Sequence, residues 1–186
     1  MSGIGHNNGP TMEPGAGWRR YAWKRARADL LPKLPLEIVR LRVRRARELG
    51  LDYKTYAGVR ASTGRDLVAF LFSSNALRVG PQVAIIPAER AAKLSGVIDC
   101  RHTALVHGPL DAARLLTENA PLIDTAGAAP TLLDGWSATR EKVAAVLGKI
   151  PRDGVLVIGD TGFEREWSMA GKLAGFLPSD RYFTAD

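Results

Sequence analysis

The chain has 186 residues, of which 46% are hydrophobic and 24% charged, a composition typical of one compact domain with an accessory segment. Its single cysteine excludes a disulfide framework and a four-thiolate zinc site, and its apolar runs are far shorter than the roughly 20 residues of a membrane span, so we expect a cytoplasmic protein. Lys and Arg number 26 against 19 Asp and Glu, and this net charge of +7 indicates a polyanion or an acidic surface as partner.

Residues 1–17 predict a disordered tail, because their five Gly and two Pro leave too little apolar surface to offset the entropy of ordering. No apolar stretch of roughly 7 to 15 residues follows a basic start, so a secretory signal is not expected. Within this tail, the segment GIGHNNGP resembles leader peptides of some bacterial phage and mobile-element proteins. The resemblance implies such an association and nothing about mechanism.

Positive charge is concentrated in residues 18–60, which hold 13 Lys or Arg against four Asp or Glu, a net charge of +9. From Ala61 onward, 13 basic and 14 acidic residues nearly cancel. We therefore divide the chain into a tail (1–17), a basic helical segment (18–62) and an α/β domain (63–186).

The basic segment predicts a helical arm. Good helix formers fill residues 18–31 up to Pro32, and residues 36–49 repeat apolar side chains at helical spacing. Gly50 is placed to end the second helix, and Asp52 to cap a short third helix that runs to Arg60 or Ser62.

After Gly64, short apolar strands alternate with short helices, which predicts a small mixed or parallel sheet flanked by helices. The expected strands span 66–73, 83–86, 96–100, 103–106, 122–124 and 155–158. The expected helices span 88–94, 109–119, 137–147 and 163–174, and residues 126–130 are expected to form a loop.

The basic helices interleave cationic and aromatic side chains. In the first helix, Arg20, Lys24 and Arg27 share one stripe and Trp23 lies on another. Arginine forks contact phosphates and base edges, and aromatic faces stack on unpaired bases. The predicted nucleic-acid-binding residues are Trp18, Arg19, Arg20, Trp23, Lys24, Arg25, Arg27, Arg40, Arg44 and Arg47.

Other interpretations of the basic helices stay open. Trp18 and Trp23 can instead dock the arm onto the α/β body or a further copy of the chain, and a basic amphipathic helix also suits an anionic membrane surface. The order of helix, Gly50 turn and helix is also that of a helix-turn-helix DNA reader. In that interpretation, the side chains that face the groove are those of Tyr53, Lys54, Tyr56 and Arg60.

Two carboxylates follow the expected strand 155–158. Asp160 lies just beyond the strand, and Glu164 lies near the start of the next helix, so the pair could hold Mg2+ for phosphate hydrolysis. The segment from Val155 to Trp167 resembles the strand–Gly–Asp–x–x–Phe turn of NYN-type PIN-like nucleases, which implies a metal-dependent nuclease. The chain differs from that family at the end of the first expected strand, where the family has an aspartate and this sequence has Ser-Ser-Asn at 73–75.

The same loop has two simpler interpretations. Asp160 and Thr161 can cap the following helix, or Gly159 and Gly162 can let the backbone approach an anion at the helix N-terminus. The Ser-Ser-Asn segment is expected to form a turn.

One thiol and two imidazoles form a third cluster, composed of Cys100, His102 and His107. A soft metal could bridge them, but no fourth ligand follows at zinc-site spacing, so we predict a buried thiol and a hydrogen-bonded histidine. The sequence contains no Walker loop, dinucleotide fingerprint, nucleophilic serine elbow or metalloprotease helix.

We interpret the chain as a non-enzymatic nucleic-acid-binding protein, associated with a phage or mobile element, that grips phosphates through its basic helical segment and needs no cofactor. One alternative is a small nuclease or phosphodiesterase that uses Mg2+ on Asp160 and Glu164. Another is a structural or assembly protein whose basic arm makes protein–protein contacts, including contacts within a homo-oligomer.

Overall fold

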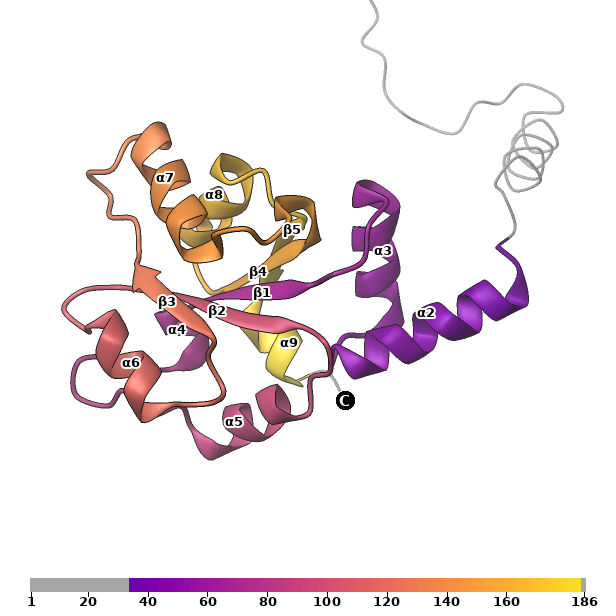
Figure 1. The fold of residues 1–186 in the computed structure, drawn as a ribbon, viewed down its shortest axis with the longest axis horizontal. Coiled ribbons are helices and arrows are strands. Elements are labelled where there is room, and N and C mark those ends of the chain that lie inside the picture. Colours follow the sequence, from indigo (N-terminus) through magenta and orange to yellow (C-terminus); the bar gives the residue numbers. More distant parts are fainter. Residues whose placement is uncertain (1–33, 185–186) are drawn as a thin grey trace, which may run out of the picture. The chain divides into compact units, whose positions relative to one another are not determined.

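The computed structural model describes residues 34–184 of a chain that divides into two units, residues 1–39 and 40–186 (Figure 1). Helix α2 (Leu36–Glu48) begins in the first unit and ends in the second. The predicted tail 1–17 and the predicted helix 18–31 lie outside the described residues.

The second unit contains a parallel sheet flanked by helices, which confirms the predicted α/β class (Figure 1). Its strands are β1 (Ala69–Ser73), β2 (Arg101–Val106), β3 (Thr125–Ala128), β4 (Val155–Gly159) and β5 (Gly175–Pro178). Its other helices are α3 (Tyr53–Thr63), α4 (Ser74–Leu77), α5 (Ala88–Ser95), α6 (Ala112–Glu118), α7 (Trp136–Leu147), α8 (Gly162–Ala170) and α9 (Ser179–Thr184), with a 3-10 turn η1 (Arg152–Gly154) before β4.

The strand order is β3-β2-β1-β4-β5, and every neighbouring pair is parallel. The chain builds outward from β1 on one side to β3, then returns to place β4 on the other side of β1. In open α/β sheets, ligands bind outside the carboxyl ends of the strands at such a reversal. The segments after Ser73 of β1 and Gly159 of β4 therefore border the expected crevice.

The core has two parts, one on each face of the sheet. Phe70 and Phe72 of β1 pack on one face with Tyr182 of α9, in a cluster that also draws on α4, α5 and α6. Leu71 points to the other face and packs with Trp167 of α8 and with α7. Successive side chains of a strand point to opposite faces, so both faces of the sheet are apolar and both are covered by helices (Figure 1).

The end of α2 and helix α3 belong to the same core as the sheet. Ala46 and Leu49 of α2 and Tyr56 of α3 are buried in the cluster that contains Phe70. Asp52 caps α3 as predicted, because its side chain accepts the backbone N–H of Thr55 at 2.9 Å. The compact unit therefore begins at Arg40, whereas the charge pattern suggested a boundary after residue 62.

Residues 83–86, predicted as a strand, form none in the structure. The side chain of Asn119 takes the place of a neighbouring strand: its Oδ1 accepts the N–H of Ile86 and its Nδ2 donates to the carbonyl of Ala84, both at 2.7 Å. Ala84 and Ile86 are buried, so the apolar residues at 83–86 reflect a loop that packs into the core and not a strand.

Two other predicted strands are misplaced. Residues 122–124, predicted as a strand, form none, and β3 forms instead at Thr125–Ala128, which overlaps the predicted loop 126–130. Residues 96–100 form no strand either, because β2 begins at Arg101. β3 is an edge strand whose residues are incompletely buried, and its Thr-Ala-Gly-Ala sequence lacks the bulky apolar side chains that mark a strand.

The predicted helix 163–174 ends at Ala170, and β5 and α9 were not predicted. A Cβ atom on Gly171 would lie 2.9 Å from the side chain of Val143, so this glycine lets α8 end close against α7. The chain then turns, and the N–H of Ala174 donates to the carbonyl of Val155 before β5 begins. Within residues 34–184, no helix combines the length and apolar character needed to cross a bilayer.

Candidate functional site

Glu164 lies at the centre of a polar cluster at the carboxyl ends of β1 and β4. It is fully buried, and its Oε2 accepts the backbone N–H groups of Asp160 at 2.5 Å and Thr161 at 3.0 Å. Thr161 caps α8, because its Oγ1 accepts the N–H of Glu164 at 3.1 Å, which completes a capping box. Oε1 accepts from Nδ2 of Asn75 at 2.8 Å, so one carboxylate joins the β4–α8 turn to the segment after β1.

His107 extends this cluster to the end of β2. Its backbone N–H donates to Oγ of Ser74 at 3.1 Å, and its Nδ1 lies 2.9 Å from the same oxygen. When the Ser74 hydroxyl donates to Nδ1, the neutral ring carries its proton on Nε2, which lies 3.7 Å from Oε1 of Glu164. The ring also packs against Trp167, with 5.5 Å between centroids.

Gly159 makes room for the buried carboxylate. A Cβ atom at this position would lie 2.7 Å from Oε2 of Glu164 and 2.9 Å from the ring of Phe176. A larger residue would therefore push Glu164 out of its hydrogen bonds to the turn.

Asp160 and Arg78 supply the exposed charges of the cluster. Oδ1 of Asp160 accepts a hydrogen bond from the hydroxyl of Ser179, and its Oδ2 lies 3.9 Å from Nη1 of Arg78. They border a shallow cavity of about 390 Å³, lined by Asn75, Arg78, Val79, Gly80, Asp160 and Thr161. This cavity occupies the crevice that the strand order predicts.

The same contacts bear on the predicted Mg2+ site. Asp160 follows the strand and Glu164 starts the helix as expected, but both carboxylate oxygens of Glu164 accept hydrogen bonds from the chain itself. Within the described part of the chain, no group of three or more His, Cys, Asp or Glu side chains is placed to hold a metal ion. The role of these two residues in metal binding stays a prediction without a supporting arrangement.

Comparisons with other proteins add no family to this picture. The chain matches no family model, no curated protein and no solved structure. Its function must therefore be argued from the arrangement of its own residues.

One arginine of the basic helix α2 makes hydrogen bonds to the segments that lead into the sheet. Arg45 donates to the backbone carbonyls of Leu67, Ile98 and Asp99 at 2.8 to 3.1 Å, and its Nε donates to Oδ2 of Asp66 at 3.0 Å. Burial opposes the charge on Arg45, but the negative charge and hydrogen bond of Asp66 outweigh it and raise the pKa of the guanidinium. Arg45 thus connects α2 to the segments that enter β1 and β2.

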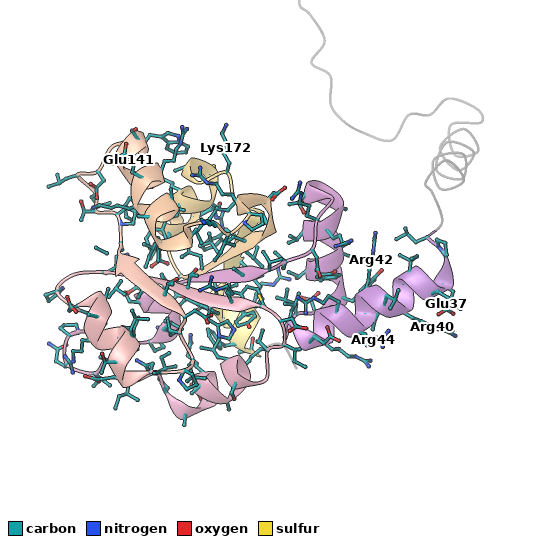
Figure 2. The ribbon with its side chains drawn as sticks, viewed as in Figure 1. Glu37, Arg40, Arg42, Arg44, Glu141 and Lys172 are labelled. Atoms are coloured by element: carbon teal, nitrogen blue, oxygen red, sulfur yellow. The ribbon has the colours of Figure 1, made fainter. Side chains whose placement is uncertain are left out.

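The neighbouring arginines of α2 are directed away from the sheet. Figure 2 shows Arg42 and Arg44 on opposite sides of the helix, with Arg40 on the side of Arg44. No ion pair of Arg42, Arg44 or Arg47 is found within the described part of the chain, and Arg44 and Arg47 are exposed. Residues 40–66 hold eight Lys or Arg against three Asp or Glu, whereas residues 67–184 hold twelve of each. The charges of Arg44 and Arg47 are therefore not neutralised by an ion pair within residues 34–184.

The other predicted binding residues lie outside the described residues: Trp18, Arg19, Arg20, Trp23, Lys24, Arg25 and Arg27. The helix-turn-helix interpretation is wrong for Tyr56, which is 2% exposed and donates its hydroxyl to Oδ1 of Asp66 at 2.8 Å. A side chain held in the core cannot face a DNA groove.

The Cys100, His102 and His107 cluster forms no shared site. His102 is buried and hydrogen-bonded as predicted, with Nδ1 2.9 Å from the carbonyl of Leu122, whereas His107 is bound to Ser74. Burial raises the pKa of the Cys100 thiol to about 12.

Sequence reasoning missed three members of the polar cluster. The sequence predicts only a turn at Asn75, and no motif in the sequence marks Arg78 or Ser179 as part of a site. A strand order with β1 beside β4 would have pointed to Asn75, because parallel strands bring their carboxyl ends to one edge.

Proposed function

We propose that the protein binds nucleic acid through the basic surface of α2. The observation that carries this proposal is that arginines close together on α2 have different surroundings. Arg45 is bound to the sheet, while Arg44 and Arg47 are exposed and have no acidic partner among residues 34–184.

A helix held in this way presents its cations in a defined arrangement. Guanidinium groups make charge-assisted, often bidentate hydrogen bonds to phosphate, and an anchored helix loses little backbone freedom on binding. Such contacts recognise the nucleic-acid backbone and not the base sequence, so the proposed binding does not depend on sequence.

The salt dependence of binding follows from the number of phosphate contacts. Two contacts, from the exposed Arg44 and Arg47, correspond to a slope of about −2 for the logarithm of affinity against the logarithm of salt concentration on duplex DNA. Six contacts, with the predicted arginines of residues 18–31 included, correspond to about −5.

The test compares two charge-reversed double variants in a fluorescence anisotropy titration of labelled single- and double-stranded DNA and RNA. The first is Arg44→Glu with Arg47→Glu. The matched control is Lys149→Glu with Lys172→Glu, which removes the same charge from exposed residues that make no ion pair in the described part of the chain. Figure 2 shows Lys172 near α7 and α8, away from α2.

We expect the α2 variant to lose at least about tenfold in affinity and to flatten the salt slope by about 2, because two phosphate contacts are removed. The control should retain the slope of the unaltered protein. An equal loss in both variants, or binding that does not respond to salt, contradicts the proposal. If the unaltered protein instead forms oligomers that dissociate on α2 charge reversal, light scattering will show it, and the assembly alternative replaces nucleic-acid binding.

A further inference from the structure

Arg90, in the first turn of α5, is a buried cation without a carboxylate partner. Its residue surface is 8% exposed, its Nη1 donates to the carbonyl of Ala76, and its guanidinium lies 4.1 Å from the centroid of the Phe183 ring. Its Nε is buried and has no hydrogen-bond partner, and no acidic group of residues 34–184 lies within ion-pair distance of it.

The surroundings of Arg90 lack the counter-charge and the acceptors that a buried guanidinium normally has. A buried charge is costly unless it is paired and its donors are satisfied, and Arg90 has one carbonyl and one aromatic face in place of a counter-charge. Burial lowers the pKa of Arg90 and the positive charge of Arg78 adds to this effect, while the more distant carboxylates of Asp160 and Glu89 oppose it only in part. A second cation near an unpaired buried one points to an anion that occupies the space between them.

The structure contains a cavity at this place. It measures about 300 Å³ and is lined by Arg78, Glu89, Arg90, Asp180, Phe183 and Thr184. Arg78 follows α4 and also lines the crevice beside Asp160, so its side chain stands between the two cavities. The volume is at the lower end of the range for small-molecule sites, which suits an anionic group and little more.

The acidic residues around the cavity leave Arg90 unpaired. Asp180 uses Oδ1 to accept the backbone N–H of Arg181 at 2.7 Å, and Glu89 is exposed on the first turn of α5. Asp160 lies nearest to Arg78, at 3.9 Å. Arg78 and Arg90 are the two cationic side chains that line this cavity.

We propose that this cavity binds a phosphate group, free or carried by a small molecule, between the guanidinium groups of Arg78 and Arg90. Two planar guanidinium groups match the several oxygens of a phosphate better than a single carboxylate would. The site is separate from the nucleic-acid surface, because α4 and α9 follow the carboxyl ends of β1 and β5, whereas Arg45 holds α2 at the segments that enter β1 and β2.

The test is isothermal titration calorimetry of the full chain with inorganic phosphate, glycerol phosphate and acetate at matched ionic strength. The informative variant is Arg78→Gln, because Arg78 is exposed and its loss leaves the core intact. Arg90→Lys is a second variant that retains the charge and removes the fork. Lys172→Gln is the control, an exposed cation outside the cavity.

We expect saturable phosphate binding that weakens at least about tenfold in Arg78→Gln and in Arg90→Lys and is unchanged in Lys172→Gln. Tighter binding of glycerol phosphate than of inorganic phosphate identifies a phosphorylated small molecule, and equal binding identifies free phosphate. No saturation by about 10 mM phosphate, or equal binding by Arg78→Gln and the unaltered protein, overturns the proposal. Acetate binding as tight as phosphate binding also overturns it. Nucleic-acid affinity should be unchanged in Arg78→Gln, so either proposal can fail without the other.

Discussion

Replacing Arg45 or its neighbour Arg44 by alanine should give opposite results, although both changes remove one arginine from the same helix. Arg45 makes hydrogen bonds to three backbone carbonyls and to Asp66, with its side chain only 16% exposed. Arg44 is exposed and makes no hydrogen bond or ion pair within the described part of the chain. The pair thus separates the structural from the binding role of a positive charge on α2.

The magnitude for Arg45→Ala follows from these contacts. Each of the three carbonyl bonds contributes about 1 kcal/mol net, and the ion pair with the 38%-exposed Asp66 adds about 0.5 kcal/mol after screening by solvent, so the loss is about 3.5 kcal/mol. For a unit of this size, that loss lowers the Tm by about 7 to 14 °C. Arg44→Ala should change stability by less than about 0.5 kcal/mol, because no contact is removed.

The assay is urea denaturation followed by circular dichroism, with Tm as a second readout and nucleic-acid affinity measured on the same preparations. Arg44→Ala should weaken binding and flatten the salt slope by about 1 while leaving the urea midpoint in place. If Arg45→Ala is no less stable than Arg44→Ala, the fastening of α2 by Arg45 is refuted. If Arg44→Ala binds nucleic acid as the unaltered protein does, the proposed binding surface is wrong.

Three more predictions concern groups in the core. Glu164→Ala should lower the free energy of unfolding by about 2 to 3 kcal/mol, more than the roughly 1 kcal/mol of Thr161→Ala, because it leaves two backbone N–H groups and an amide without their acceptor; equal urea midpoints would argue against this. The thiol of Cys100, with its pKa raised to about 12 by burial, should react with iodoacetamide at pH 8 more than about tenfold slower in the native than in the urea-unfolded chain. Burial lowers the pKa of His102, so the unfolded chain takes up its proton first as pH falls below about 6.5, and stability should decline from there. His102→Gln should reduce that decline in urea midpoint between about pH 7 and pH 5, and an unchanged decline would exclude His102 as its source.

The central strands were predictable because they are buried on both faces. β1 and β4 each consist of five buried residues, so they read as continuous apolar runs, as expected for the interior of a parallel sheet. The edge strands β3 and β5 are short and incompletely buried, and their sequences do not stand out from loops. Runs of apolar residues therefore identified the central strands β1 and β4 and missed the edge strands β3 and β5.

The candidate sites were predictable only where their contacts are local. The cap of α8 by Thr161 joins residues three apart, and such spacing is visible in a sequence. Helical periodicity also predicted the apolar face of residues 36–49, of which Ala46 and Leu49 are buried in the structure. The inward role of Arg45 was not visible in the sequence, because all its partners except Glu48 lie 21 to 54 residues away. The contact between Asn75 and Glu164 likewise requires β1 to lie beside β4, which the order of elements along the chain does not reveal.

The strand order also has a consequence for how the chain acquires its structure during synthesis. β1 is complete at Ser73, but its partner β4 begins only at Val155, and every strand pair in the sheet is parallel and joined through intervening helices. The ribosome must therefore release most of the domain before β4 can pair with β1. Phe70 and Phe72 lack the cover of Tyr182 for longer still, because α9 follows β4 in the chain. During this interval the aromatic face and the unpaired edge of β1 are exposed to other chains, so chaperone capture during translation should be strongest before β4 and α9 emerge.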